Sequence, residues 1–311
     1  MIFAARGLLV SLAFFAVVYC PLSCLVALLW RAMKRLGLKF SMTSSRFLFG
    51  LRIFPFTASS VVAVFFTFPS FWMMERPSLD EDARTFFLAA CGLLIVSAGM
   101  VRVLRARART TRAVKRWLLR TSSTGNPKRT PTLSAASGAP ALILVGIRTP
   151  RVMVSDAAAT VLSDDELRVA IRHELGHMRY WDNFKKALIN AIPFPCMSSL
   201  ETAWREAAEL AADDAAVRNR QDALDLAAAL IKLSRSSKQW IEPALASGLV
   251  CGVSSVSQRV ERLLEWRVAG RPCKRTWPWT LLVLATVIVG IASNYGAALV
   301  LTHHLTELLV P

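Results

Sequence analysis

The chain has 311 residues, of which 54% are hydrophobic and 19% charged, and its formal net charge is +17. Its mean hydropathy of +0.42 is unusual for a soluble protein, and its apolar runs are long enough to cross about 30 Å of hydrocarbon, which argues against an Ala-rich soluble core. The six cysteines show no C-x-x-C pairing, so we expect free thiols rather than a disulfide scaffold or a cysteine zinc site.

Four apolar runs of roughly 20 residues, each with few or no charges, predict four membrane-spanning helices. They cover residues 7–30, about 53–74, about 86–104 and 277 to about 302. The first run is longer than the apolar region of a usual signal peptide and has no A-x-A cleavage site, so we expect it to remain as an anchor. Arg52, Pro55 and Pro69 lie near the ends of the second run and predict a kink or a tilt there.

The charged residues are distributed unequally among the segments between these runs. Residues 31–46 and 102–120 carry basic residues and no acid, whereas residues 75–84 carry four acids against two arginines. By the positive-inside rule, the N-terminus and residues 75–84 lie outside, and residues 105–276 lie in the cytoplasm. A basic stripe resting on anionic lipid headgroups explains the net charge better than a nucleic-acid partner, which we do not expect.

A basic juxtamembrane helix and a linker follow the third run. Residues 121–140 are rich in Ser, Thr, Gly and Pro, which is typical of a linker, and the folded unit then starts at Ala141. Two short apolar runs, 141–147 and 151–155, flank an Arg-Thr-Pro segment and predict two strands of a hairpin-like edge. We expect such an edge to accept an extended peptide through main-chain hydrogen bonds.

A capped helix comes next. Ser163 and Glu166 have the spacing of a capping box and predict a helix from about 164 to 181. Pro193 and Pro195, within residues 184–197, should then break the chain and turn it back.

Three more helices are predicted after that break. Ser198 and Glu201 have the spacing of a second capping box, at the start of a helix that runs to about Arg218. Residues 222–234 predict an Ala-rich helix, and residues 256–268 predict the last helix before the fourth apolar run.

His173, Glu174 and His177 form an H-E-x-x-H motif in the middle of the first capped helix. Residues four apart share a helix face, so both imidazoles can bind one Zn²⁺ while Glu174 reaches a metal-bound water. The motif therefore predicts zinc-assisted hydrolysis of peptide bonds, with Glu174 as the catalytic base.

The third protein ligand ought to be a carboxylate, because His303 and His304 should lie across the membrane and no cysteine is suitably spaced. The candidates on the second capped helix are Glu201, Glu206, Glu209, Asp213 and Asp214. Glu209 and Asp213 share one helix face, flanked by alanines small enough to let two helices approach. Glu209 can then bind zinc, and Asp213 can accept the N–H of a ligating histidine. An ordinary solvated helix face is the alternative for these acids.

Several segments resemble the integral-membrane zinc peptidases of the BlaR/MecR type, which are gluzincin-like. These segments are 151–155, 162–167, 173–177 with Arg179, Asp182 and Asn183, and 209–213. The HtpX and CAAX-processing membrane peptidases share the H-E-x-x-H plus E-x-x-x-D core. The resemblance covers roughly residues 141–268, and it implies Glu209 as the third zinc ligand, Asp213 as its support and a place in the bacterial inner membrane.

The resemblance also implies a signalling peptidase that cleaves a cytoplasmic repressor or itself. BlaR/MecR sensors continue after their last span into a penicillin-binding domain, whereas this sequence ends at Pro311. We therefore expect sensing through the membrane part, the short outer loop or a separate sensor subunit, and a homo-oligomer is also open. The alternatives are a quality-control protease of the HtpX type and a non-proteolytic membrane scaffold with a structural zinc. An intact Glu174 argues against the scaffold, because a structural site needs only ligands.

The predicted fold is mainly α, with four transmembrane helices and a cytoplasmic α+β, zincin-like metallopeptidase domain that carries a small strand region. The predicted domains are a membrane domain with three helices (1–105), a basic juxtamembrane helix and linker (106–140), the zinc domain (141–276), and the fourth span with a short outer tail (277–311).

Overall fold

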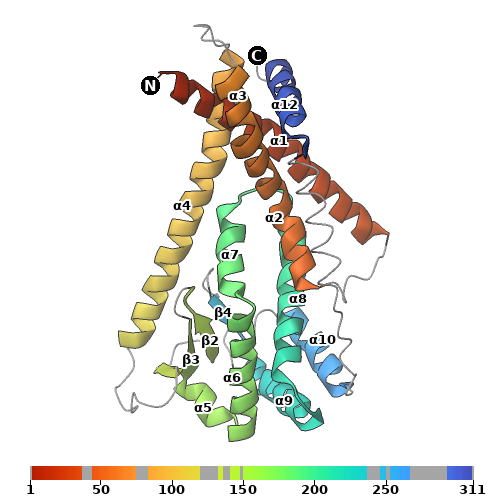
Figure 1. The fold of residues 1–311 in the computed structure, drawn as a ribbon. Helices are drawn as coiled ribbons and strands as arrows, with labels where there is room; N and C mark the ends of the chain where they lie inside the picture. Colours follow the sequence, from red (N-terminus) through yellow and green to blue (C-terminus); the bar gives the residue numbers. More distant parts are fainter. Residues whose placement is uncertain are drawn as a thin grey trace.

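The computed structural model describes residues 2–36, 44–74, 83–119, 132–135, 141–147, 150–236, 246–249, 253–266 and 293–309. Long apolar helices form one end of the molecule and an α/β part forms the other, with two helices of the α/β part reaching up between the long ones (Figure 1). We call these ends the membrane part and the α/β part.

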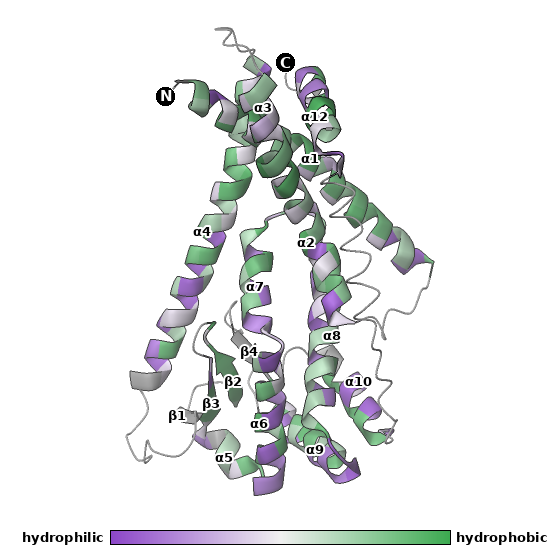
Figure 2. Ribbon diagram, viewed as in Figure 1, coloured by the Kyte–Doolittle hydropathy of each residue, from purple (hydrophilic) through white to green (hydrophobic). Residues whose placement is uncertain are grey.

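Three stretches of the membrane part are long and apolar enough to cross a bilayer, judged by length and composition alone: Phe3–Arg35, Ser45–Met74 and Ala83–Trp117. They are formed by α1 (Ile2–Arg35), by α2 (Ser45–Val62) with η2 (Ala63–Thr67) and α3 (Phe68–Met74), and by α4 (Ala83–Leu119). They match the first three predicted spans. In Figure 2, the lower half of α4 turns hydrophilic as it leaves the other long helices.

The predicted fourth span lies mostly outside the described residues, so the count of four is not tested. The described part begins at residue 293 and forms α12 (Tyr295–Leu309), at the same end of the molecule as the N-terminus (Figure 1). The basic residues after 266 and the acidic residues 75–82 also lie outside the described part. Cys20, Cys24, Cys91 and Cys196 are free thiols, as expected.

The distortion predicted for the second span is a π-helical turn, η2, just before Pro69. Proline has no N–H to donate to the carbonyl four residues earlier, and its ring clashes with that carbonyl. The carbonyl in question belongs to Phe65, and the wider turn relieves the clash. The hydroxyl of Tyr295 on α12 donates a hydrogen bond to Phe65 O at 2.7 Å. The helix therefore continues through Pro69, and a side chain supplies the lost donor.

The small sheet has the strand order β1-β3-β2-β4. Its strands are β1 (Thr132–Ala135), β2 (Leu142–Val145), β3 (Arg151–Ser155) and β4 (Ala246–Gly248). β2 and β3 pair antiparallel, which confirms the predicted hairpin, and Gly146 adopts the positive φ of 105° at the turn. Two predictions are wrong: β1 lies within the predicted linker, and β2 and β3 are both paired on two sides, so neither is an edge strand.

The helices of the α/β part pack around this sheet and around one another. They are α5 (Asp156–Val161), α6 (Asp164–Arg179), α7 (Asp182–Ala191), α8 (Ser198–Ala216), α9 (Arg220–Ser236) and α10 (Val253–Leu264). Val169 and Ala170 of α6 meet Leu226 and Leu230 of α9 in one core, and each of these side chains is fully buried. This core holds α6 rigidly against α9.

The predicted cap of α6 is correct, but the predicted cap of α8 is wrong. Ser163 and Glu166 form both hydrogen bonds of the capping box. At α8 the N-cap residue is Met197, which makes no side-chain cap, and Glu201 is instead bound to an arginine of the membrane part. The break predicted for residues 184–197 is confined to 192–197, because α7 occupies the first half of that segment.

The hairpin formed by α7 and α8 inserts between the membrane helices (Figure 1). Arg52 of α2, itself only 1% exposed, donates from Nε to Glu201 Oε1 at 3.0 Å and from Nη2 to Ile192 O at 2.6 Å. Trp30 of α1 donates to Ser199 Oγ at 3.1 Å. A buried arginine inside an apolar span is costly unless it is paired. These contacts therefore fix the α/β part to α1 and α2.

Candidate metal centre

The histidines of the H-E-x-x-H motif lie where α6 meets α8. His173, Glu174 and His177 are at most 1% exposed. The two helices approach closely because Gly176 has no side chain: a Cβ placed there would lie 3.2 Å from Ala212 Cα and 3.3 Å from Ala212 O. Ala212 lies between Glu209 and Asp213 in the sequence, so this contact brings both acids to the histidines, as the small residues predicted.

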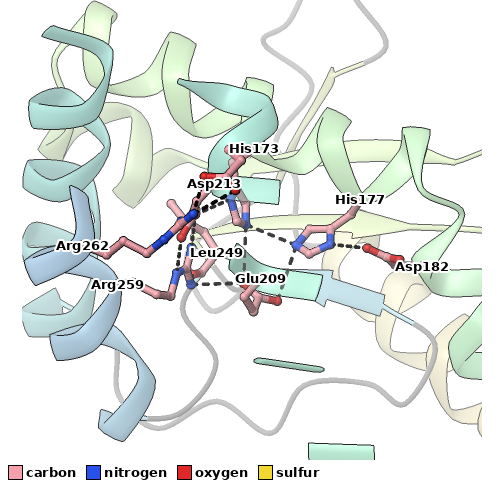
Figure 3. Close-up of polar contacts among 9 residues, drawn as sticks. His173, His177, Asp182, Glu209, Asp213, Leu249, Arg259 and Arg262 are labelled. Atoms are coloured by element: carbon pink, nitrogen blue, oxygen red, sulfur yellow. Dashed lines mark hydrogen bonds and ion pairs between the residues drawn. The ribbon is translucent and has the colours of Figure 1, made fainter. Parts of the chain in front are cut away.

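Three side chains form a triangle of potential metal ligands (Figure 3): one ligand atom each from His173, His177 and Glu209 lies within 4.8 Å of the others. His173 Nε2 and His177 Nε2 are 3.2 Å apart, and they lie 3.5 Å and 3.4 Å from Glu209 Oε2 and Oε1. Tetrahedral zinc binds nitrogen and oxygen at about 2.0–2.2 Å, which places neighbouring ligand atoms about 3.3–3.5 Å apart. The three side chains therefore fit one zinc ion. Within the described residues, they form the group of His, Cys, Asp and Glu side chains whose ligand atoms converge in this way.

The second nitrogen of each histidine faces a carboxylate. His173 Nδ1 lies 2.9 Å from Asp213 Oδ1, and His177 Nδ1 lies 2.8 Å from Asp182 Oδ2. Lys185 Nζ lies 3.0 Å from the other oxygen of Asp182. A carboxylate that accepts the Nδ1 proton fixes the tautomer in which Nε2 is free to bind a metal. Asp213 stands where the sequence predicted it, while Asp182 was noted only as part of the family resemblance and had no predicted role.

Arg259 of α10, for which the sequence predicted no role, contacts both carboxylates of α8 at the site. Its Nε and Nη2 donate to the two oxygens of Asp213 at 2.8 and 2.6 Å. Its Nη1 lies 3.0 Å from Glu209 Oε2 and donates to Leu249 O at 2.9 Å. The guanidinium is 2% exposed and sits between the two carboxylates in Figure 3.

The proton equilibria of the site reflect this crowding of charge. Burial by itself lowers the pKa of a histidine. Burial is the largest single effect at both histidines, but the neighbouring carboxylates together outweigh it. Asp213 and Glu209 raise the pKa of His173, and Glu209, Asp182 and Glu174 raise the pKa of His177 to about 10. Burial favours a protonated Glu209, yet the charges of His177 and Arg259 hold its pKa well below its usual range.

The charges around the histidines leave an excess of two negative charges. The carboxylates are Glu174, Asp182, Glu209 and Asp213, and the cations are Lys185 and Arg259. Two protons on the histidines or one divalent cation neutralise this excess. Metal ligands bind in their deprotonated form, so a cation and these protons compete for the same site. The donor set and the charge thus both suit a divalent metal.

The other candidate carboxylates of α8 lie elsewhere. Glu201 binds Arg52, Asp214 pairs with Arg262 at the surface, and Glu206 is exposed. The structure thus brings Glu209 and Asp213 to the histidines and keeps the alternatives away. Their roles, and that of Glu174 as base, stay predictions.

A cavity of about 230 Å³ opens beside His177. Its apolar walls are Leu144, Ile147, Pro150, Met178, Trp181 and Phe184. Trp181 has a left-handed backbone with φ 58° and is 63% exposed, an arrangement that is strained for a bulky residue. A cavity of about 150 Å³ already holds a benzene ring, so this one has room for a large apolar side chain next to the metal centre.

Comparison with protein-family models gives a match over residues 83–263, more than half of the chain, to the family described as BlaR1 peptidase M56. The matched range begins with α4 and ends in α10, so it includes every residue of the metal centre. A search of curated proteins found no match.

Proposed function

The chain belongs to the BlaR1 peptidase M56 family, and on that premise we propose that it is a zinc-dependent membrane endopeptidase. The observation that carries this proposal is the triangle of His173, His177 and Glu209, in which the nearest nitrogen and oxygen atoms of each pair are 3.2–3.5 Å apart, close to the spacing of ligand atoms around tetrahedral zinc. Glu174 lies on the same helix, fully buried beside the triangle. A purely structural zinc site would not require it.

The residues divide the chemical work between them. Bound zinc would lower the pKa of a water molecule and polarise the scissile carbonyl. Glu174 takes a proton from that water as the new C–O bond forms and delivers it to the leaving nitrogen as the C–N bond breaks. Asp213 and Asp182 keep the imidazoles of His173 and His177 oriented.

The substrate should reach the site along β4 rather than along the predicted hairpin. Among the described strands, β4 is an outer strand of the sheet, and it contacts both α6 and α7. An extended peptide can add to such a strand by main-chain hydrogen bonds. The cavity beside His177 then favours a large apolar side chain next to the scissile bond.

We place the metal centre on the cytoplasmic side of a bacterial inner membrane. Basic residues gather at the end of the long helices that is nearer the α/β part (Figure 1). They are Arg31, Lys34 and Arg35 at the end of α1, Arg46 at the start of α2, and the basic residues between positions 102 and 116 of α4. Loops on the cytoplasmic side carry such an excess. Reporter fusions at positions 110 and 219 should be cytoplasmic, and a fusion at position 78 should be external. An external report from position 219 would contradict this topology.

For the biological role we propose signalling, by cleavage of a cytoplasmic repressor or another regulatory protein. The family match supports a membrane peptidase, and the cytoplasmic placement would give access to such a substrate. A quality-control protease shares this chemistry but would cleave many damaged membrane proteins. A separate sensor subunit or a homo-oligomer would supply the trigger.

Comparison of the wild type with Glu174→Gln tests the proposal. Both full-length proteins, purified in detergent, should bind one zinc ion, because the variant keeps all three ligands. Only the wild type should cleave proteins of the host cell, since an amide cannot accept the water's proton. One or a few cleaved regulators would indicate signalling and many membrane proteins would indicate quality control. Equal cleavage by the variant would assign the base to another residue.

A further inference from the structure

We propose that Arg259 is a positioning residue of the metal centre, which holds Glu209 as a metal ligand and Asp213 as the partner of His173. The inference rests on the proposed zinc site but does not depend on peptidase activity. It starts from the position of Arg259 in its own helix. Val256 and Leu263 of α10 are buried core residues, and Arg259 lies between them on the same face. An arginine at a core position is costly unless all its contacts are made.

The contacts of Arg259 meet that requirement. Asp213 receives a forked pair of hydrogen bonds, Glu209 Oε2 lies 3.0 Å from Nη1, and Leu249 O accepts a further bond. The planar guanidinium matches a carboxylate in this forked way, whereas a lysine ammonium acts as a point charge. Two partners, Glu209 and Asp213, lie on α8, and the third, Leu249, follows β4 directly. Arg259 therefore joins its own helix α10 to α8 and to the end of β4 at the metal centre.

Without this cation the two acids would be poorly placed. Glu209 and Asp213 are four residues apart on α8, where like charges repel. Each acid also contacts His173: Glu209 Oε2 lies 3.5 Å from His173 Nε2, and Asp213 Oδ1 lies 2.9 Å from His173 Nδ1. Arg259 contacts both of these same oxygens, at 3.0 and 2.6 Å. It therefore fixes the side-chain rotamers on which the geometry of the triangle depends.

If Arg259 positions the ligands, replacing it should weaken zinc binding; if it acts only through its charge, replacing it should strengthen zinc binding. Removing a positive charge from the neighbourhood of a cation site strengthens cation binding, as Coulomb's law requires. Losing the residues' orientation weakens it, by about 10- to 100-fold when an outer partner of a metal ligand is lost. The direction of the change in zinc affinity therefore separates the two.

The chain offers a matched control in Arg262. It lies on the same helix α10, and its Nη2 donates to Asp214 of α8 at 2.7 and 2.9 Å, so it joins the same two helices. Its side chain is 43% exposed and that of Asp214 is 53% exposed. Exposed pairs of this kind contribute little, and neither residue touches the triangle. Arg262→Gln thus removes the same kind of side chain without disturbing the metal centre.

The experiment compares full-length wild type, Arg259→Gln, Arg259→Lys and Arg262→Gln in detergent. Zinc affinity is measured by competition with a chelator, and the visible spectrum of the Co²⁺-loaded proteins reports the coordination geometry. Arg259→Gln should bind zinc about 10- to 100-fold more weakly and alter the cobalt spectrum. Arg259→Lys should fold with the charge retained and still show an altered spectrum, because it lacks the fork. Arg262→Gln should match the wild type.

Unchanged or tighter zinc binding in Arg259→Gln, with the wild-type cobalt spectrum, would overturn the proposal. If Arg259→Gln does not fold, a wild-type spectrum and affinity in Arg259→Lys would overturn it equally. Failure of the wild type itself to bind zinc would instead contradict the proposed function.

Discussion

Replacing Gly176 with alanine tests whether the metal centre depends on the close approach of α6 and α8. Gly176 lies between His173 and His177, and its neighbour Ala212 lies between Glu209 and Asp213. A Cβ at position 176 would lie 3.2, 3.3 and 3.4 Å from Ala212 Cα, O and Cβ. These atoms are mostly backbone, so no side-chain rotation can relieve the contact. The two helices must move apart by a few tenths of an ångström.

We expect Gly176→Ala to change the free energy of unfolding little and the zinc affinity clearly. Alanine is about 0.8–1.0 kcal/mol better than glycine inside a helix, whereas overpacking costs about 1–3 kcal/mol. The free energy of unfolding should therefore fall by only about 0–2 kcal/mol. Metal–ligand distances in a good site lie within about 0.2 Å of their usual values, and a shift of a few tenths of an ångström between α6 and α8 exceeds that tolerance. We expect zinc affinity to fall about tenfold, which corresponds to about 1.4 kcal/mol.

The assay is a chelator competition for zinc with thermal unfolding of the same samples. Gly50→Ala is the matched control, because a Cβ at Gly50 of α2 would meet nothing within 4 Å. It should leave zinc affinity unchanged. Wild-type zinc affinity in Gly176→Ala would refute the reasoning, since the site would then tolerate a wider separation of α6 and α8.

Three further predictions follow from the contacts of single residues. Glu209→Gln should abolish tight zinc binding, because it weakens one of three ligands, whereas Glu206→Gln should leave it unchanged; the opposite result would show that the assigned register of α8 is wrong. Asp182→Asn should weaken zinc binding about 10- to 100-fold in the same titration, and full affinity would show that the orientation of its histidine does not depend on it. Arg52→Gln should lower the free energy of unfolding in detergent by about 1–3 kcal/mol, because it removes the hydrogen bonds to Ile192 O and to the partly buried Glu201, and wild-type stability would contradict that account.

Much of the metal centre was predictable because it depends on short-range spacing. The capping box at Ser163 sets where α6 begins, and the spacing of His173 and His177 places them on one face. The E-x-x-x-D spacing likewise selected Glu209 on α8. The end of α6 was predicted two residues too late, at 181, because Trp181 adopts a left-handed conformation that ends the helix. No residue type in that turn signals such a conformation.

The rest of the site depends on long-range contacts. Arg259 meets Asp213 across 46 positions of sequence, and Arg52 meets Glu201 across 149. The helical periodicity of α10 places Arg259 on the apolar face of the helix. This was the one feature of the sequence that indicated a buried arginine. A break was predicted over residues 184–197 from Pro193 and Pro195, and it is found at 192–197. The sequence could not show that α7 places this break among the membrane helices.

Helix α8 connects the membrane part with the metal centre. Its first turns carry Ser199 and Glu201, which bind Trp30 of α1 and Arg52 of α2. Glu209 follows eight residues after Glu201, which is about 12 Å along a helix at 1.5 Å per residue. One helix therefore carries both the contacts with α1 and α2 and, about two turns further on, the third side chain of the triangle. The triangle thus draws one corner from a helix that is bound to the membrane part, while α6 supplies the other two.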